Sequence, residues 1–316
     1  MTTALMLSGL ILAIILVTSY KSSAIGGGKN YTTILKGIAI ILVMLSHFTG
    51  NMSRIFTPLG GIGVAMFLIL SGYGLNESFK KNGLDGFWKK RFLRIWIPYA
   101  IAFSLLCFYQ PCNFREYLFN LICYHCPYWY IKYTICWYIV FWLTARFLPK
   151  YKLPVMAVAG FSTLFWCEGV RGEQAISFVT GVFISDRDYK IDETNKLGIK
   201  WLITLAFVGL VFLAFKQTGL YRSFTEDMLI NISQLPVKWC LALFVIYTLA
   251  YLPLFTQSRF LTLSGILSYE LYLLHFPLRG LAGSNISYAI GLITASYIAA
   301  YILYQYDNRL SKLFSK

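Results

Sequence analysis

An imidazole and a cation are the most conspicuous chemical groups in an otherwise apolar stretch, Leu35 to His47. Imidazole exchanges a proton near neutral pH, so it serves as a general base or as a nucleophile. Lys36 and His47 are eleven positions apart, roughly 16 Å along a helix, which is about half the hydrocarbon thickness of a bilayer. With Lys36 at one membrane face, we expect His47 near mid-depth or just beyond. An ionisable group at that depth is costly to bury, which indicates a functional site.

A second polar set lies in the late apolar stretch Leu263 to Pro277. Tyr272 and His275 are three positions apart and share a helix face, whereas Glu270 does not share a face with His275. A tyrosine hydroxyl beside an imidazole binds a substrate hydroxyl, or the two groups satisfy each other between helices. Both interpretations stay open.

Six cations, more than in any other connector, follow the third apolar segment: Lys80, Lys81, Lys89, Lys90, Arg91 and Arg94. Arg91 and Arg94 are three positions apart on one helix face, where two guanidinium groups can hold one phosphate. This pattern predicts a polyanionic ligand.

Two further stretches have a structural and a functional interpretation. Glycines and small residues from Gly60 to Gly74, including Ser71 and Gly72, either let helices pack closely or belong to the site. The aromatic run Tyr128 to Tyr133, including Trp129 and Tyr130, is either an interfacial belt or a platform on which sugar rings stack.

These residues require membrane helices to position them. The chain has 316 residues, 58% of them hydrophobic and 13% charged, with a mean hydropathy of +0.62. We therefore predict an all-α polytopic bundle, in which residues 1–30 form an N-terminal anchor helix with a glycine-rich link and residues 31–316 form a single membrane domain. The candidate spans are 3–20, 34–50, 61–78, 93–109, 129–147, 153–168, 174–186, 200–216, 236–255, 260–280 and 286–306.

The net charge of +15 is distributed between apolar spans, which argues against a nucleic-acid-binding surface. When the connector 21–36 is placed in the cytoplasm, most Lys and Arg residues fall inside, so the N-terminus is outside and the C-terminus is cytoplasmic. The group Cys123, His125 and Cys126 offers metal-ligand types, but we expect interfacial thiols or a disulfide, with Cys112 as a further candidate, and no metal.

Four of these stretches, in order, resemble the motifs of the acyltransferase 3 family of membrane O-acyltransferases. They are the basic residue, ten positions and histidine of Lys36 to His47, the segment Gly61 to Tyr73, the segment Phe87 to Pro98, and the segment Ser268 to His275. Two features depart from the family. Lys36 stands where arginine is common, and the span 3–20 precedes the usual core of about ten spans.

The resemblance implies transfer of an acyl group, most often acetyl, from cytosolic acyl-CoA to a hydroxyl of an envelope or exported glycan or glycolipid at the bacterial plasma membrane. We expect acyl-CoA to be held by Lys36, Arg91 and Arg94 with Ser71 and Gly72, and His47 to act as general base or as acyl carrier. The residues expected to bind or support the acceptor are Trp129, Tyr130, Tyr272, His275 and Glu270. A glycolipid or polysaccharide transporter or flippase is the competing hypothesis, although the sequence shows no convincing internal repeat. A homo-oligomer is not excluded.

Overall fold

The computed structural model describes residues 2–20, 28–50, 52–122, 124, 128–279, 281, 283 and 285–314. In these residues the structure is helical and contains no strand, as the hydropathy predicted. The helices are α1 (Thr2–Tyr20), α2 (Gly28–Thr49), η1 (Arg54–Phe56), α3 (Thr57–Asn82), α4 (Phe87–Arg91), η2 (Phe92–Trp96), α5 (Ile97–Tyr109), α6 (Phe114–Leu121), α7 (Trp129–Phe147), η3 (Pro149–Tyr151), α8 (Lys152–Trp166), η4 (Gly169–Gln174), α9 (Ser177–Asp186), α10 (Ile199–Phe215), α11 (Gly219–Arg222), α12 (Asp227–Thr248), η5 (Leu249–Tyr251), α13 (Pro253–Thr256), α14 (Arg259–Ile266), α15 (Ser268–Leu278) and α16 (Ile286–Phe314).

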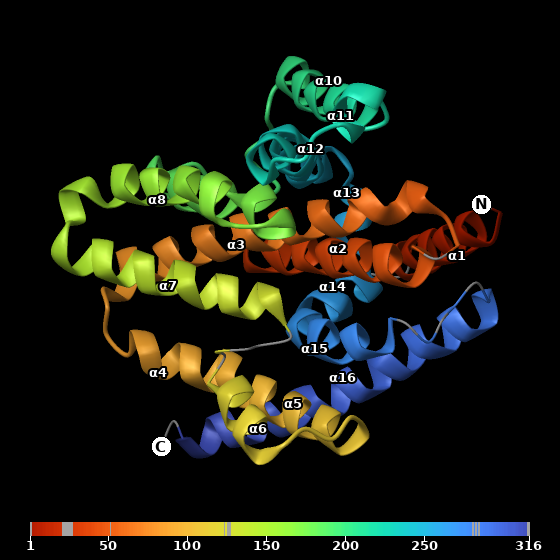
Figure 1. The fold of residues 1–316 in the computed structure, drawn as a ribbon, viewed down its shortest axis with the longest axis horizontal. Coiled ribbons are helices and arrows are strands. Elements are labelled where there is room, and N and C mark those ends of the chain that lie inside the picture. The colour runs from red at the N-terminus through yellow and green to blue at the C-terminus, as the bar shows by residue number, and fades with distance from the viewer. Residues whose placement is uncertain are drawn as a thin grey trace.

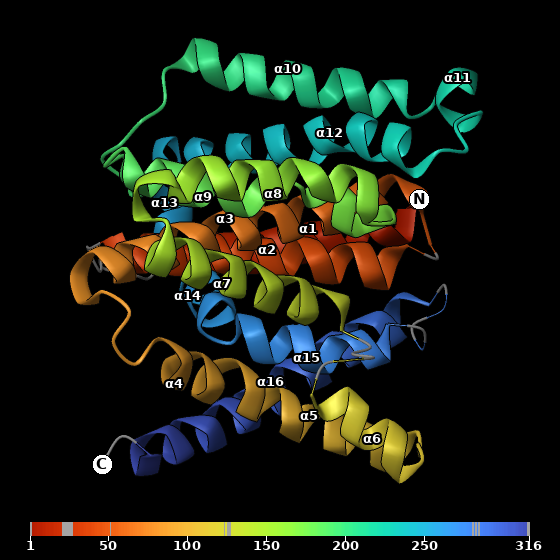
Figure 2. The same ribbon diagram turned by 60° about the vertical axis from the view of Figure 1, so that its left-hand side comes forward.

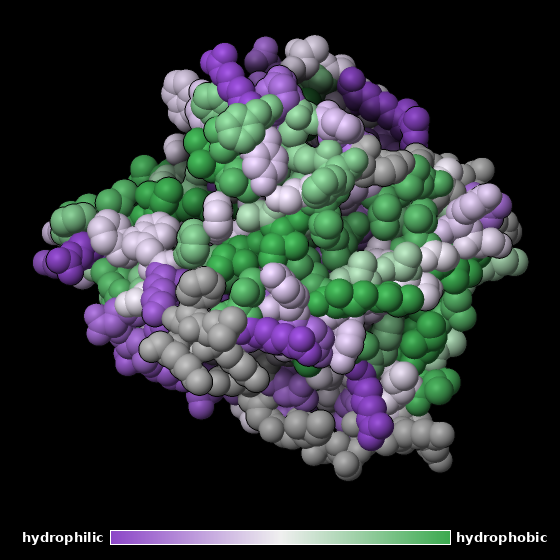
Figure 3. All heavy atoms as spheres, turned by 90° about the horizontal axis from the view of Figure 1, so that it is seen from below, coloured by the Kyte–Doolittle hydropathy of each residue, from purple (hydrophilic) through white to green (hydrophobic). Residues whose placement is uncertain are grey.

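Within the described part of the chain, five helical segments are long and apolar enough to cross a membrane. They are residues 30–49, 54–82, 87–108, 227–251 and 286–310, and α1 and α10 contain shorter apolar helices. Each predicted span contains a helix, whereas the total number of crossings stays a prediction. Large apolar side chains such as Phe108 are almost fully exposed, and Figure 3 shows hydrophobic residues over much of one face. Exposed apolar area of this extent is typical of a lipid-facing surface.

The long helices α2 and α3 form the centre of the bundle, with most other helices running along them (Figures 1 and 2). α2 packs against α3, α14 and α15, while the other side of α3 packs against α9 and α12. The start of α1 and the end of α16 lie at opposite ends of the long axis in both views. The predicted sidedness of the termini requires this arrangement.

Glycines bring the central helices unusually close to their neighbours. A Cβ atom on Gly265 of α14 would overlap the carbonyl oxygen of Thr33 in α2, and one on Gly72 of α3 would overlap that of Phe178 in α9. Close backbone approach of this kind is the usual role of small residues between membrane helices. These contacts fix α2 and α3, which carry several of the predicted site residues.

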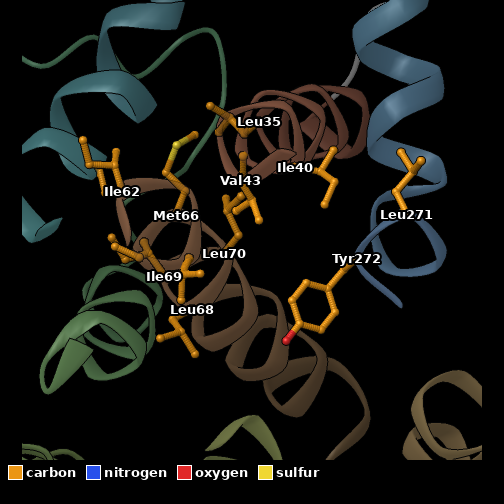
Figure 4. Close-up of a cluster of buried hydrophobic side chains, with 14 of the residues drawn as sticks. Leu35, Ile40, Val43, Ile62, Met66, Leu68, Ile69, Leu70, Leu271 and Tyr272 are labelled. Carbon is orange, nitrogen blue, oxygen red and sulfur yellow. The ribbon is translucent and has the colours of Figure 1, made fainter. Parts of the chain in front are cut away.

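Apolar side chains fill the space where α2, α3 and α15 meet. Figure 4 shows Val43 of α2 on the side toward α3, and Ile40 on the side toward Leu271 and Tyr272 of α15. Leu35, Ile40 and Leu271 have no exposed surface. The helices that carry the predicted site residues are therefore tightly packed against one another.

Candidate functional site

The two histidines singled out in the sequence are hydrogen-bonded to each other. His47 Nδ1 lies 2.8 Å from His275 Nε2, and His275 Nδ1 lies 2.6 Å from the carbonyl oxygen of Leu271. A carbonyl only accepts, so His275 Nδ1 carries a proton and donates it to Leu271. In neutral His275 the Nε2 atom is then an acceptor, and His47 Nδ1 donates to it. This assignment leaves His47 Nε2 unprotonated, which is the form that a general base or a nucleophile requires.

Aromatic rings hold the histidine pair in place. The two imidazole planes are inclined by 19° with centroids 5.1 Å apart, Phe48 and Phe276 contact them edge-on, and the Tyr272 ring centroid lies 6.1 Å from that of His275. His275 has no exposed surface, whereas His47 is partly accessible. Because His275 is enclosed and hydrogen-bonded at both nitrogens, it is suited to orient His47 rather than to react itself.

The helix bounds define where His47 lies along α2. α2 begins at Gly28, so Lys36 lies roughly 12 Å from the start of the helix, and His47 is only two residues from the last residue, Thr49. His47 is therefore close to the far end of α2. Its depth in a bilayer, predicted with Lys36 at one membrane face, stays a prediction.

A cavity of about 630 Å³ brings together most of the predicted donor-binding residues. We call it the arginine cavity. It is lined by Lys36, Phe67, Leu70, Ser71, Gly74, Leu75, Ser78, Lys90, Arg91, Arg94, Ile95, Tyr130, Ile131, Thr134, Tyr138, Ser268, Tyr269 and Tyr272. This lining contains four cations and no carboxylate, so its charge suits an anionic ligand.

A change in helix type positions the arginines of this cavity. Residues 92–96 form a π-helix between α4 and α5, in which the amide of Ile97 bonds to the carbonyl of Phe92. Pro98 lacks an amide proton and cannot continue the regular pattern there. Short π-helical turns are frequent at functional sites because they change the direction of nearby side chains.

Contacts with neighbouring groups hold Arg91 in the cavity. Its Nη1 donates to the carbonyl of Phe87 at 3.0 Å, and its guanidinium lies 4.0 Å from the centre of the Phe87 ring. Arg91 is half-buried, whereas Arg94 is exposed. A guanidinium that lies over a ring keeps its remaining N–H groups, in the plane of the guanidinium, available to a phosphate, which agrees with the predicted role of Arg91.

Ser71 and Gly72, predicted together, lie in different places. Ser71 lines the arginine cavity, where its hydroxyl shares a hydrogen bond of 2.8 Å with Tyr138. Gly72 is buried against the backbone of α9 and is not part of the cavity lining. Gly72 therefore packs helices together and does not face the cavity. Consecutive positions on a helix point about 100° apart, so Ser71 and Gly72 face different neighbours.

Tyr272 stands between the arginine cavity and the histidine pair. Its ring lines the cavity, lies 5.3 Å from the Tyr130 ring and makes an edge contact with His275. His47 is not among the residues that line the cavity. The Tyr272 ring thus contacts both the arginine cavity and His275, the hydrogen-bond partner of His47.

The predicted aromatic pair Trp129 and Tyr130 is also divided. Tyr130 faces the arginine cavity, while Trp129 lines a second pocket of about 430 Å³ between α7 and α8. We call this the tryptophan pocket. Its lining is Tyr124, Trp129, Lys132, Tyr133, Cys136, Trp137, Val140, Ala159, Thr163, Cys167 and Arg171.

Glu270 lies away from both histidines, as its position on the helix predicted. It is buried, its Oε2 has no hydrogen-bond partner among the residues that the structure describes, and it interacts electrostatically with Asp307 of α16 and with Arg94. This places Glu270 behind the arginine cavity rather than beside an acceptor at His47.

Several residues of the site were not singled out in the sequence. Tyr138 lines the arginine cavity, Tyr128 donates to the carbonyl of Leu273 at 2.9 Å, and Arg279 lies over the Phe276 ring beside His47. The spacing of Tyr130, Thr134 and Tyr138 on one helix face was a signal that could have revealed Tyr138. Arg279 had no such signal, since its proximity to His47 joins distant segments of the chain.

Of the predicted cysteine group, Cys112 is among the described residues. Cys123, His125 and Cys126 lie outside the described residues. Cys112 is next to Cys107, with 3.2 Å between the sulfur atoms, and both are free thiols. Among the residues that the structure describes, no cluster of three or more His, Cys, Asp or Glu side chains is arranged to hold a metal ion.

Comparison with known proteins bears on the whole arrangement. A family model for an acyltransferase domain, acyltransferase 3, matches residues 29–306, which includes the histidine pair and the arginine cavity but not α1. No curated protein and no solved structure matches the chain significantly. The match covers well over half of the sequence and agrees with the motifs and with the apolar helices. The chain therefore belongs to the acyltransferase 3 family of membrane acyltransferases.

Proposed function

We propose that this protein transfers an acyl group, acetyl by default, from cytosolic acyl-CoA to a hydroxyl of an envelope or exported glycan. The hydrogen-bonded series His47, His275 and Leu271 carries this proposal, because it presents an unprotonated His47 nitrogen close to one end of α2. In the same proposal the protein lies in the bacterial plasma membrane with its N-terminus outside, as the positive residues favour.

The donor binds at the opposite end of the site. Arg91, Arg94 and Lys36 hold the phosphates of coenzyme A, and the pantetheine arm extends along α2 toward the histidines. Lys36 and His47 are roughly 16 Å apart along the helix axis, a distance that a slender, extended arm can span. The Tyr272 ring must turn aside for the thioester to reach His47, a side-chain movement of the kind that commonly gates active sites.

Two routes at His47 Nε2 are consistent with the geometry. As a general base, this nitrogen takes the acceptor proton while the hydroxyl oxygen attacks the thioester carbonyl, the carbon–sulfur bond breaks, and the proton passes to the thiolate. As a carrier, it attacks the thioester carbonyl first and coenzyme A leaves as the thiolate. The acceptor hydroxyl oxygen then attacks the acyl carbon, the carbon–nitrogen bond to the imidazole breaks, and the hydroxyl proton passes to the thiolate. Arg279 places a positive charge near the pair, where it can stabilise the developing oxyanion.

The test uses purified protein in lipid nanodiscs with radiolabelled acetyl-CoA and a panel of glycans. The wild-type protein is expected to release free thiol and label an acceptor, and His47→Ala to lower the rate by about a thousandfold. Ser46→Ala is the matched control, since this neighbouring hydroxyl bonds to the carbonyl of Thr57 and not to a histidine.

A folded His47→Ala protein with undiminished transfer would refute the role of His47. Rapid quenching separates the two routes. A trapped acyl-histidine supports the carrier, and ternary-complex kinetics without an adduct support the base.

A further inference from the structure

We propose that the tryptophan pocket binds a negatively charged sugar of the acceptor, at a distance from the sugar that is acylated. This inference rests on the proposed function and specifies the acceptor class as an anionic glycan of several sugar units. The charged substituent is a carboxylate or a phosphate.

The wall of the pocket is a row of aromatic rings on one face of α7. Trp129, Tyr133 and Trp137 follow each other at four-residue intervals, with ring centroids 6.3 and 6.1 Å apart. The Trp137 ring is stacked on Phe178 at 5.3 Å, which fixes its position. Tyr133 and Trp137 are buried and support Trp129, which is partly accessible. The electron-rich face of the Trp129 ring attracts the polarised C–H groups of a sugar ring.

The charged side chains in the described lining of the pocket are both cations. Lys132 of α7 and Arg171 of η4 both line it and are exposed, and its described lining contains no Asp or Glu. Lys132 Nζ donates to the carbonyl of Tyr124 at 2.9 Å, so its position is defined. The hydroxyl of Thr163 lies in the same lining. Two cations beside aromatic walls distinguish an anionic sugar from a neutral one.

The pocket lies at the same end of the bundle as His47 but on the other side of α7. Tyr128, the residue before α7, bonds to Leu273 of α15, and η4 contacts the start of α3 through the bond from Gln174 to the carbonyl of Gly61. By the predicted topology, this is the outer end.

Consecutive ring contacts connect the pocket with the catalytic histidine. Trp129, Tyr130, Tyr272, His275 and His47 follow each other with centroid separations between 5.1 and 6.1 Å. Three side chains, Tyr130, Tyr272 and His275, come between Trp129 and His47 in this series, so a sugar on Trp129 is not the one that reacts at His47. A chain of several sugars can occupy both places, which makes the pocket a distal subsite that selects and aligns the chain.

Binding to the unmodified protein in zwitterionic nanodiscs tests the inference without any turnover. The probes are tetragalacturonate, a phosphorylated tetrasaccharide and a neutral galactose tetrasaccharide, measured by microscale thermophoresis. The wild-type protein should prefer at least one charged probe, and Lys132→Gln with Arg171→Gln should weaken that binding about tenfold while changing neutral binding less than about twofold. Both substituted side chains are exposed, so the variant should fold.

Arg222→Gln is the matched control, because Arg222 is an exposed cation of α11 that does not line the pocket. Equal binding of charged and neutral probes, or the same loss in the control, would overturn the inference. Loss of probe binding in phosphatidylglycerol nanodiscs, restored by the double substitution, would also overturn it by showing that a lipid headgroup is the occupant. Thiol release from acetyl-CoA, measured separately, reports on the proposed function, so the two ideas can fail independently.

Discussion

Two faces of α7 each present side chains at four-residue intervals, and each face lines a different pocket. Tyr130, Thr134 and Tyr138 face the arginine cavity, and the residues one position earlier, Trp129, Tyr133 and Trp137, face the tryptophan pocket. The same helix therefore contributes to two sites. The difference comes from the partners, since α3 and η2 enclose one face while α8 and η4 enclose the other.

The cations on the two sides also differ in environment. Arg91 is half-buried and stacked on a ring, whereas Lys132 and Arg171 are exposed to solvent. Partly buried charges are screened less by water and salt than exposed ones. Changes at the arginine cavity should consequently have larger effects than changes at the tryptophan pocket, and each should alter a different kinetic constant.

The largest effect is expected at His275, the hydrogen-bond partner of His47, and not at either pocket. His275→Leu removes the acceptor that fixes the tautomer of His47, and kcat should fall about a hundredfold with little change in the KM of donor or acceptor. His275→Gln retains an acceptor oxygen and should lose less. Steady-state kinetics with both substrates varied measure this. Equal loss in the two variants would show that His275 does not act through the tautomer.

An intermediate effect is expected at the arginine cavity. Arg91→Ala removes a partly buried phosphate contact, so the KM for acyl-CoA should rise about tenfold while the acceptor KM changes less than about twofold. Arg187→Ala, an exposed cation outside the cavity, is the control. If the donor KM of Arg91→Ala matched the control, the charge at this position would serve only membrane topology.

The smallest effects on KM are expected at two adjacent residues of α7, Trp129 and Tyr130, which line different pockets. Trp129→Phe reduces the ring surface of the tryptophan pocket and should raise the acceptor KM about threefold. Tyr130→Phe removes a hydroxyl on the other face and should leave the acceptor KM unchanged while altering the donor KM by about twofold. Titration of each substrate against both variants checks this, and a shared response would mean that the two faces act as one site.

Much of this arrangement could be predicted because it depends on local spacing. Hydropathy predicted the helices, and the position of Lys36, Arg91, Arg94 and Ser71 around one cavity followed from the motifs. The sequence also predicted that Tyr272 and His275 share a face. These features depend on helical periodicity, which a single sequence displays directly.

The features that the sequence did not predict depend on contacts between distant segments. The pairing of His47 with His275 joins residues 228 positions apart, and no local pattern specifies it. Gly72 was assigned to the donor site although α9 covers it, because a glycine can serve either packing or binding. The start of α2 at Gly28, six residues before the predicted span 34–50, was missed because it precedes the apolar run.

The π-helix at residues 92–96 couples the rotational phase of two segments. Deletion of one residue within it would restore a regular helix, and α4 would then be rotated by about 100° relative to α5. Tyr99 and Phe103 would keep their packing, and the Arg91 side chain would turn away from the arginine cavity. The length of this short turn thus determines whether a folded chain presents Arg91 to that cavity.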